Sequence, residues 1–445
     1  MKKSILLMFM LLAAGVQVRA QALEGYWKGV LDIVGNRQEI AFCITAQGDG
    51  YTVTMDVPAA GAFDIPATIE TLNDVELRIS VDALKATYEG YLFKTIINGT
   101  FRQNGMEVNV VLSKAQKPLK LRPQEPEGPF PYTEEEVKFT NRNDKVNLTG
   151  TLTIPEGKGP FPAVVLVSGS GAQNRDEEMF GHRPFAVIAD RLARNGIATL
   201  RYDDRGTGGS DKGPEGATTD NFADDAAAAL KYLRGRGGFS KIGVAGHSEG
   251  GQIAFILGAK GLPDFIISLA GPSIKGSKVL ATQQRAIYEA SKVPEYAIQA
   301  NENLFAKLYD VVDNSASPAA AEPEVDNIIV NLPDEQKSLV KQQLLNPWMF
   351  RFCRYDPAAD IAATKCPTLV LSGEKDLQVI PAANIPVFEK IAAEQPQREL
   401  IIKVLPDLNH LFQHCKTGLS NEYGTIQETI SEDVLELMAT FVRGL

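Results

Sequence analysis

The residues best suited to chemistry lie in a short glycine-rich run near the middle of the chain. Residues 246–250 read Gly-His-Ser-Glu-Gly, after an apolar segment at 241–245 and before a helix-like segment at 252–257. A serine flanked this way in a strand–turn–helix context is typical of an exposed nucleophile, because side chains at the glycine positions would collide with the neighbouring strand or helix. The helix start also supplies backbone N–H groups that stabilise an oxyanion. We therefore expect Ser248 to be a nucleophile.

A serine nucleophile needs a general base, and histidine is scarce enough here for elimination to be informative. The chain contains 4 His. Where this motif occurs, the acid and then the histidine follow the serine along the chain, which excludes His182 and His247. His410 follows the apolar segment 399–405, at the end of a predicted strand, whereas His414 lies a further turn on and is more simply a surface or supporting residue. We expect His410 to be the base.

The carboxylate that orients the histidine is expected just after the preceding strand. Residues 368–372 are typical of a buried strand and are followed by Gly-Glu-Lys-Asp, which places Asp376 where it can accept a hydrogen bond from the imidazole. Glu374 is the first alternative. Asp407 is the second, although it lies close in sequence to His410.

A second oxyanion donor is expected from the loop after the apolar segment 163–167. Residues 168–171 read Ser-Gly-Ser-Gly, a backbone able to approach a substrate oxygen closely, so we expect the N–H groups of Ser170 and Glu249 to form the oxyanion hole. A dinucleotide-binding turn would need Gly or Ala at the position of Asn174, and no Gly-Lys-Ser/Thr phosphate loop occurs. No closely spaced set of histidines and carboxylates suggests a metal. We expect neither cofactor nor metal.

The segments around these residues predict an α/β architecture. Short apolar runs alternate with amphipathic stretches in which apolar residues recur every three or four positions. This alternation predicts a mostly parallel sheet with helices on both faces, and ligands bind such sheets at the carboxyl ends of the strands. The apolar runs lie at 163–167, 197–202, 241–245, 265–270, 368–372 and 399–405.

One interval interrupts this alternation. Between Ala270 and Cys366 about 95 residues pass with helical but no convincing strand character, although a crossover needs only about a dozen residues. We expect an inserted helical cap at about 273–360. Its aromatic residues Trp348 and Phe350 either bind substrate or pack to hold the cap in place, and the sequence leaves both alternatives open.

The first part of the chain has a different pattern of apolar and polar residues. Apolar and polar residues alternate in steps of two between turn residues, which predicts a small antiparallel β-domain over 21–122, closed or half closed into a barrel. Trp27 and Tyr26 near its start either line a ligand pocket or pack in the core. Five prolines, at positions 118, 123, 126, 129 and 131, indicate a stiff linker over 123–134 before a second domain over 135–445.

The N-terminus is typical of a secretory signal peptide over residues 1–20. Lys2 and Lys3 precede a short apolar run, and Val18 and Ala20 supply small residues before a cleavage site. The run is shorter than the roughly 20 apolar residues of a membrane span, so we expect no stable membrane anchor. We expect the protein to be exported, to the periplasm or beyond. Cleavage would remove three basic and no acidic residues, which changes the net charge from −10 to −13.

Charge and cysteine content restrict the function further. A net negative chain argues against a nucleic-acid partner. The 4 Cys are too sparse for a disulfide framework and form no C-x-x-C pair. Cys353 and Cys366 are the most local pair in an oxidising compartment, and buried free thiols are the alternative.

The motifs together resemble those of the α/β-hydrolase superfamily. The resemblance is carried by residues 168–171, 203–210, 246–250, 373–376 and 409–410. It implies an α/β-hydrolase fold with an inserted helical cap, preceded by the small antiparallel β-domain.

More narrowly, residues 170–177 and 354–357 resemble exported bacterial esterases with an N-terminal β-domain, close to the dienelactone-hydrolase and serine-aminopeptidase-like groups. This resemblance implies hydrolysis of carboxylic esters of short or medium acyl groups through an acyl-enzyme. In one departure, Ser168 stands where many relatives have histidine, which affects the expected geometry of the oxyanion loop.

Two other functions remain open. The same residues could cleave peptide bonds, as in a serine aminopeptidase or acyl-peptide hydrolase, or the chain could be a non-catalytic ligand-binding protein. The negative charge disfavours polyanionic substrates and so favours a small neutral ester, including acylated saccharides. The oligomeric state is left open.

Overall fold

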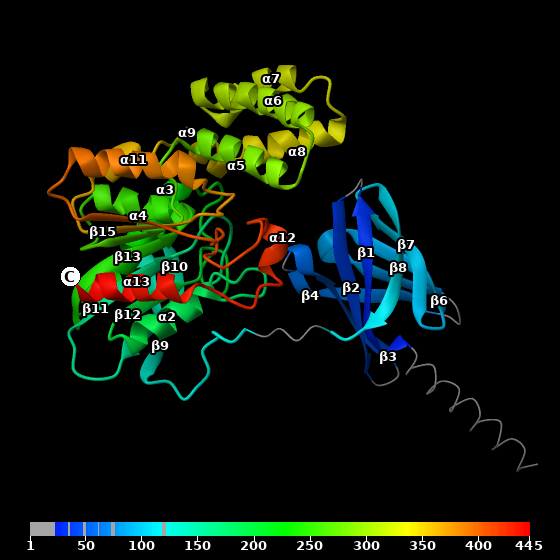
Figure 1. Ribbon diagram of the computed structural model, residues 1–445, viewed down its shortest axis with the longest axis horizontal. Coiled ribbons are helices and arrows are strands. Elements are labelled where there is room, and N and C mark those ends of the chain that lie inside the picture. Colours follow the sequence, from blue (N-terminus) through cyan, green and yellow to red (C-terminus); the bar gives the residue numbers. More distant parts are fainter. Residues whose placement is uncertain (1–22, 34–35, 48–49, 61, 73–75, 118–121) are drawn as a thin grey trace, which may run out of the picture. The chain divides into compact units, whose positions relative to one another are not determined.

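The computed structural model describes residues 23–33, 36–47, 50–60, 62–72, 76–117 and 122–445 (Figure 1). These residues divide into two compact units. The first contains the described residues up to 117, together with 179–181 and 423–427, and the second contains 122–178, 182–422 and 428–445. The predicted signal peptide lies outside the described residues.

The first unit is a closed antiparallel barrel whose strands follow the order of the chain, with β1 also pairing with β8. Its interior is filled by large side chains that include Trp27, Phe42 and Tyr88, all fully buried. The indole of Trp27 donates to the carbonyl of Leu23 at 2.7 Å. Core packing therefore accounts for Trp27. The strands are β1 (Gly25–Ile33), β2 (Asn36–Gln47), β3 (Gly50–Val57), β4 (Ala62–Leu72), β5 (Glu76–Val81), β6 (Ala86–Phe93), β7 (Ile96–Gln103) and β8 (Met106–Ala115), with short 3-10 turns at Pro58–Ala60 and Asp82–Leu84.

The second unit is built on a mixed sheet in the order β16-β15-β14-β13-β11-β12-β10-β9. Strands β11 to β16 run parallel, while β9 and β10 are antiparallel to their neighbours. This is the α/β-hydrolase fold that the sequence predicts. The strands are β9 (Tyr132–Asn141), β10 (Val146–Pro155), β11 (Phe161–Val167), β12 (Ala198–Tyr202), β13 (Phe239–His247), β14 (Ile266–Leu269), β15 (Thr368–Gly373) and β16 (Leu400–Leu405).

Helices cover both faces of this sheet. Figure 1 shows α3, α4 and α11 on one side and α2 and α13 on the other. The sequence of β11 explains why both faces are covered. Ala163 and Val165 pack in the core under α3 and α4, whereas Val164 and Leu166 pack in the core under α2 and α13, so the strand has no polar face. These helices are α2 (Pro184–Arg194), α3 (Thr219–Arg236), α4 (Glu249–Ala259), α11 (Pro381–Glu394) and α13 (Glu432–Arg443), and a single helical turn, α12 (Ser420–Tyr423), lies between β16 and α13 in the chain.

A group of helices between β14 and β15 occupies the interval for which the sequence predicts a cap. These helices lie on the α3 and α4 side of the sheet (Figure 1) and have a core of their own that includes Leu308, Val312 and Phe350. They are α5 (Gly276–Ala290), α6 (Glu295–Asn314), α7 (Pro318–Ile328), α8 (Asp334–Leu344) and α9 (Pro347–Arg354). The next helix, α10 (Ala358–Ala363), packs instead in the core of the sheet through Ile361.

Two observations concern compartment and redox state. Cys43, Cys353, Cys366 and Cys415 are free thiols. Across the part of the chain that the structure describes, no helix has the length and apolar character to cross a membrane.

Candidate active site

Ser248 lies in a strained turn between β13 and α4. Its backbone has φ 53° and ψ −116°, a conformation that costs a non-glycine residue on the order of 1–3 kcal/mol. The serine N–H donates to the carbonyl of Leu269, at the carboxyl end of β14, at 2.8 Å. Because α4 begins at the next residue, Glu249, the N–H groups at the start of this helix follow the serine directly.

The flanking glycines are required by contacts with the backbone. A Cβ at position 246 would lie 1.9 Å from the carbonyl oxygen of Gly250, and a Cβ at 250 would lie 2.2 Å from that of Val167. A Cβ at Gly169 would approach the Cβ of Ser248 to 3.2 Å. The end of β11 and the turn at Ser248 therefore pack backbone against backbone.

His410 and Asp376 form a direct pair. The imidazole Nδ1 of His410 lies 2.8 Å from Oδ2 of Asp376, and both side chains are buried. The other carboxylate oxygen accepts from the backbone N–H groups of Gln378 and Val379, at 2.8 and 2.9 Å. Since the carboxylate accepts from Nδ1–H, the free lone pair of the imidazole is on Nε2, as a general base requires.

Strand order brings this pair to the edge of the sheet that carries Ser248. Asp376 follows β15, His410 follows β16 and Ser248 follows β13. Strands β13 to β16 are parallel neighbours, so their carboxyl ends meet at one edge. The rings of His247 and His410 lie with centroids 4.8 Å apart, which places the predicted base against the residue that precedes the predicted nucleophile.

The alternative carboxylates are engaged elsewhere. Glu374 accepts from the backbone N–H of Asp407 at 3.1 Å. Asp407 itself pairs with Lys375 at 2.7 Å, and this ammonium group lowers the pKa of the Asp407 carboxyl. Asp376 is thus the candidate that the structure joins to His410.

The remaining histidines outside the turn also have other partners. His414 is exposed and pairs with Glu428 at 2.9 Å. His182 is fully buried, with its two ring nitrogens 2.9 Å from the hydroxyl of Thr429 and 3.0 Å from the amide nitrogen of Gln413.

The predicted oxyanion residues lie next to each other. The side chain of Ser170 lies close enough to the carboxylate of Glu249 to lower the pKa of that group. The same carboxylate accepts from the hydroxyl of Thr219 at 2.6 Å and from the indole N–H of Trp348 at 2.8 Å. Burial raises the pKa of Glu249. The contact between Ser170 and Glu249 involves side chains, so the use of their N–H groups remains a prediction.

The two aromatic residues predicted in the cap differ in position. Trp348 reaches the residue after Ser248 through its hydrogen bond to Glu249 and stacks on Phe352 with ring centroids 5.7 Å apart. Phe350 is buried in the core of the cap and lies under the guanidinium of Arg354. This favours packing for Phe350, while substrate binding by either residue remains a prediction.

Comparison with known proteins identifies the family. A family model described as serine aminopeptidase, S33, matches residues 182–414, more than half of the chain. The chain belongs to the serine aminopeptidase S33 family. It is 28% identical over 278 residues to the esterase EstD of Thermotoga maritima, a match that covers 61% of this chain and 60% of EstD, and so less than two thirds of that relative.

Solved structures similar to this S33 family member include an esterase and a proline iminopeptidase. An esterase of Pyrococcus furiosus is 17% identical, with a TM-score of 0.43 over 70% of this chain and 93% of that chain. The proline iminopeptidase of Mycobacterium smegmatis is 14% identical, with a TM-score of 0.42 over 70% and 98% of the two chains.

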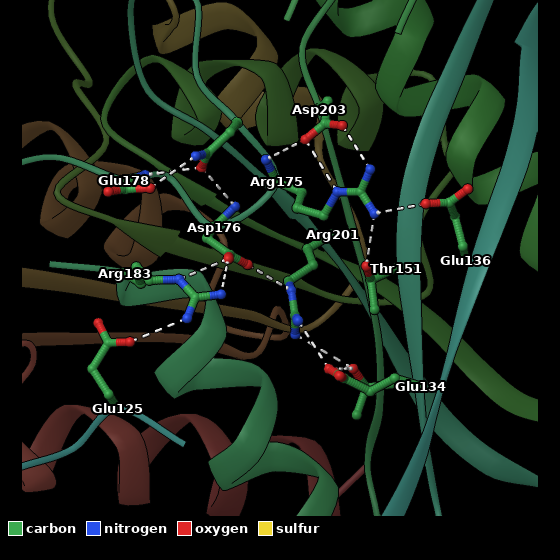
Figure 2. Close-up of polar contacts among 12 residues, drawn as sticks. Glu125, Glu134, Glu136, Thr151, Arg175, Asp176, Glu178, Arg183, Arg201 and Asp203 are labelled. Carbon is green, nitrogen blue, oxygen red and sulfur yellow. Dashed lines mark hydrogen bonds and ion pairs between the residues drawn. The ribbon is translucent and has the colours of Figure 1, made fainter. Parts of the chain in front are cut away.

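In this S33 family member, charged pairs hold the loop after β11 (Figure 2). Arg175 binds Asp203 at 2.7 Å and the hydroxyl of Thr151 at 2.9 Å. Asp176 pairs with Arg201 at 2.8 Å and with Arg183. Arg201 and Arg183 are bound in turn by the carboxylates of Glu134 and Glu125, respectively. The loop is therefore fixed at two consecutive residues.

Sequence reasoning assigned no role to the loop residues Arg175, Asp176 and Glu177. The available signal was the charged run at 175–178, which follows a glycine-rich segment and contributed only to the family resemblance. It also assigned none to Asp204, which accepts from Ser168 Oγ at 2.9 Å and from the N–H of Gln173 at 3.0 Å. Burial, helped by the nearby charges of Glu177 and Asp225, raises the pKa of Asp204 to about 7.

Replacing Gly250 with alanine is expected to lower the free energy of unfolding by about 1–3 kcal/mol, since the added methyl group overlaps the carbonyl of Val167. Urea unfolding measures this change. Gly235→Ala is the matched control, because nothing lies within 4 Å of a Cβ there and alanine favours a helix. Equal urea midpoints for Gly250→Ala and the wild type would contradict the close approach.

Asp204 is expected to make stability depend on pH. Its folded pKa of about 7 exceeds its ordinary value of 3.8, so the folded state holds the proton more tightly. The stability contributed by this group is fully present below about pH 4 and is lost as pH rises to about 7. Asp204→Asn keeps the uncharged form, so its melting temperature relative to the wild type should rise across this window. The exposed Asp334→Asn serves as control, and a difference that does not vary with pH would contradict the assignment.

Proposed function

We propose that the protein is a serine hydrolase that cleaves carboxylic esters of short or medium acyl groups through an acyl-enzyme. The 2.8 Å contact between His410 and Asp376, at the sheet edge where Ser248 occupies its strained turn, carries the proposal. Membership of the S33 family supports hydrolase chemistry. The name of the relative EstD, an esterase, supports esters as substrates.

In this mechanism, Ser248 Oγ attacks the ester carbonyl carbon while Nε2 of His410 takes the hydroxyl proton. Asp376 accepts from Nδ1–H, which keeps the imidazole oriented and stabilises the imidazolium. The N–H groups of Glu249 and Ser170 bind the tetrahedral oxyanion. The imidazolium then protonates the leaving alcohol. Water attacks the acyl-enzyme with His410 again as base, and the acid and free Ser248 are released.

Ser248→Ala should reduce turnover of p-nitrophenyl acetate by at least about 10⁴-fold, because no nucleophile remains. Asp376→Asn should reduce kcat by roughly 10⁴-fold, since the amide favours the wrong imidazole tautomer. Steady-state kinetics measures both changes. Ser240→Ala, an exposed serine on β13, should leave the rate unchanged. A Ser248→Ala variant with the wild-type rate would exclude the proposed nucleophile.

Peptide cleavage is the second candidate, and the description of the matching family favours it. An aminopeptidase must also bind the free amine of its substrate, usually with an acidic group. Glu249, the carboxylate next to Ser248, already accepts from Thr219 and Trp348. These contacts support esters over amino-terminal peptides.

A substrate panel separates the candidates. Esters of graded acyl length, including acylated saccharides, are compared with amino-acid anilides on the same purified protein. Faster cleavage of anilides would replace the ester proposal with the peptidase. If a fluorophosphonate probe fails to label Ser248, the chain would instead be a non-catalytic ligand-binding protein.

The proposed site of action is outside the cytoplasm, in the periplasm or beyond. The support is the sequence pattern of residues 1–20. When the full chain is expressed in a bacterium, the exported protein should begin at Gln21, as determined by N-terminal sequencing. Retention of residues 1–20 on the active protein would contradict export by cleavage.

A further inference from the structure

His247 is a buried histidine next to the nucleophile that the proposed mechanism leaves without a role. Both of its ring nitrogens face acceptors. Nδ1 lies 2.9 Å from Oε1 of Glu177, and Nε2 lies 3.0 Å from the backbone carbonyl oxygen of His410. Neither a carboxylate nor a carbonyl can donate a proton, so both ring nitrogens must donate, which requires the imidazolium form.

The surroundings of His247 favour this charge. Burial by itself lowers the pKa of His247, but the carboxylate of Glu177 and the carbonyl of His410 outweigh it, with a smaller contribution from Asp376. The pKa is therefore raised above its ordinary value of 6.5. When both members of an ion pair are buried, separating them leaves each charge without compensation in a poorly solvated interior. The hydrogen bond between them therefore restricts both side chains to a narrow range of positions.

Glu177 extends the pair to the oxyanion loop. The same Oε1 that contacts His247 accepts from the backbone N–H of Gly169 at 2.7 Å. Glu177 is 1% exposed and has φ 51°, a left-handed conformation that glutamate adopts only when its surroundings impose it. The loop that carries it is held by the ion pairs of Arg175 and Asp176 (Figure 2).

We propose that Glu177 and His247 are positioning residues that fix three parts of the active site relative to one another. Glu177 holds the oxyanion loop at Gly169. His247 is bonded through its own backbone to Ser248, and its Nε2–H holds the carbonyl of His410. One buried ion pair thus spans the oxyanion loop, the nucleophile turn and the loop of the base. This inference rests on the proposed function of Ser248 and His410.

Glu177→Gln tests the role of the charge. Glutamine keeps an oxygen that can accept from Gly169, but it does not stabilise the imidazolium. His247 then loses a proton at lower pH and gives up one of its two hydrogen bonds. We expect kcat for p-nitrophenyl acetate to fall on the order of 10²-fold at pH 8 with KM little changed.

The pH profile separates positioning from general stability. In Glu177→Gln the alkaline limb of kcat should move to lower pH, because His247 loses its proton at a lower pH, while the acid limb stays in place. Glu177→Asp retains the charge and should restore the alkaline limb towards that of the wild type. Glu428→Gln, which removes the carboxylate from the exposed pair with His414, should leave kcat and both limbs unchanged.

Nitrogen-15 NMR of histidine-labelled wild-type protein tests the proposal independently of activity. Both ring nitrogens of His247 should be protonated at pH 7, with signals assigned by single histidine substitutions. A single protonated nitrogen would overturn the proposal, even if Glu177→Gln fails to fold. A wild-type kcat and pH profile in folded Glu177→Gln would also overturn it while leaving the ester hydrolase proposal intact. If the wild type cleaves no ester, the proposed function fails while the NMR result still decides the charge of His247.

Discussion

The backbone contact between the end of β11 and the first turn of α4 is the constraint on which the active site depends. A side chain at position 250 would meet the carbonyl of Val167 at 2.2 Å, so the two segments can approach only through glycine. Ser248 has its strained conformation in the turn between β13 and α4, and the loop after β11 lies beside it at Gly169. The proposed nucleophile, oxyanion donors and base must be held within a fraction of an ångström. The backbone contact sets the spacing of the first two, while side-chain contacts of Asp376 and His247 hold the loop of His410.

Side chains then fix the loops that the backbone contact brings together, and most of them are charged. Arg175 and Asp176 pair with oppositely charged partners, and these ion pairs offset the desolvation cost of burying the two charges. Asp204 differs, because the donors to it are the neutral hydroxyl of Ser168 and the N–H of Gln173. Its raised pKa means that the ionised form costs stability. Ser168 stands at the position where the family resemblance leads one to expect histidine, and here its hydroxyl binds the carboxyl of Asp204.

The sequence predicts contacts that follow from strand order better than contacts that depend on loop conformation. Asp376 and His410 come directly after parallel strands, so their meeting could be inferred from the order of the chain. The contact of Glu177 with His247 joins residues 70 positions apart through an irregular loop, and no periodic pattern encodes it. Strands β9 and β10 were not predicted, and β9 (Tyr132–Asn141) begins within the expected linker over 123–134. Buried and exposed residues alternate along β9 at the sheet edge, so it lacks the continuous apolar run of β11.

Glu249 links the cap to this arrangement. Its backbone N–H is a proposed oxyanion donor, and its carboxylate binds Trp348 of α9 and Thr219 of α3. A movement of α9 would remove the Trp348 donor from the buried carboxylate of Glu249. The lost hydrogen bond would destabilise the position of Glu249, the residue that follows Ser248. The position of α9 and the placement of Glu249, a proposed oxyanion donor, are therefore energetically coupled. Under the proposed mechanism, the hydrogen bond from Trp348 to Glu249 therefore links the position of α9 to the residue that follows Ser248.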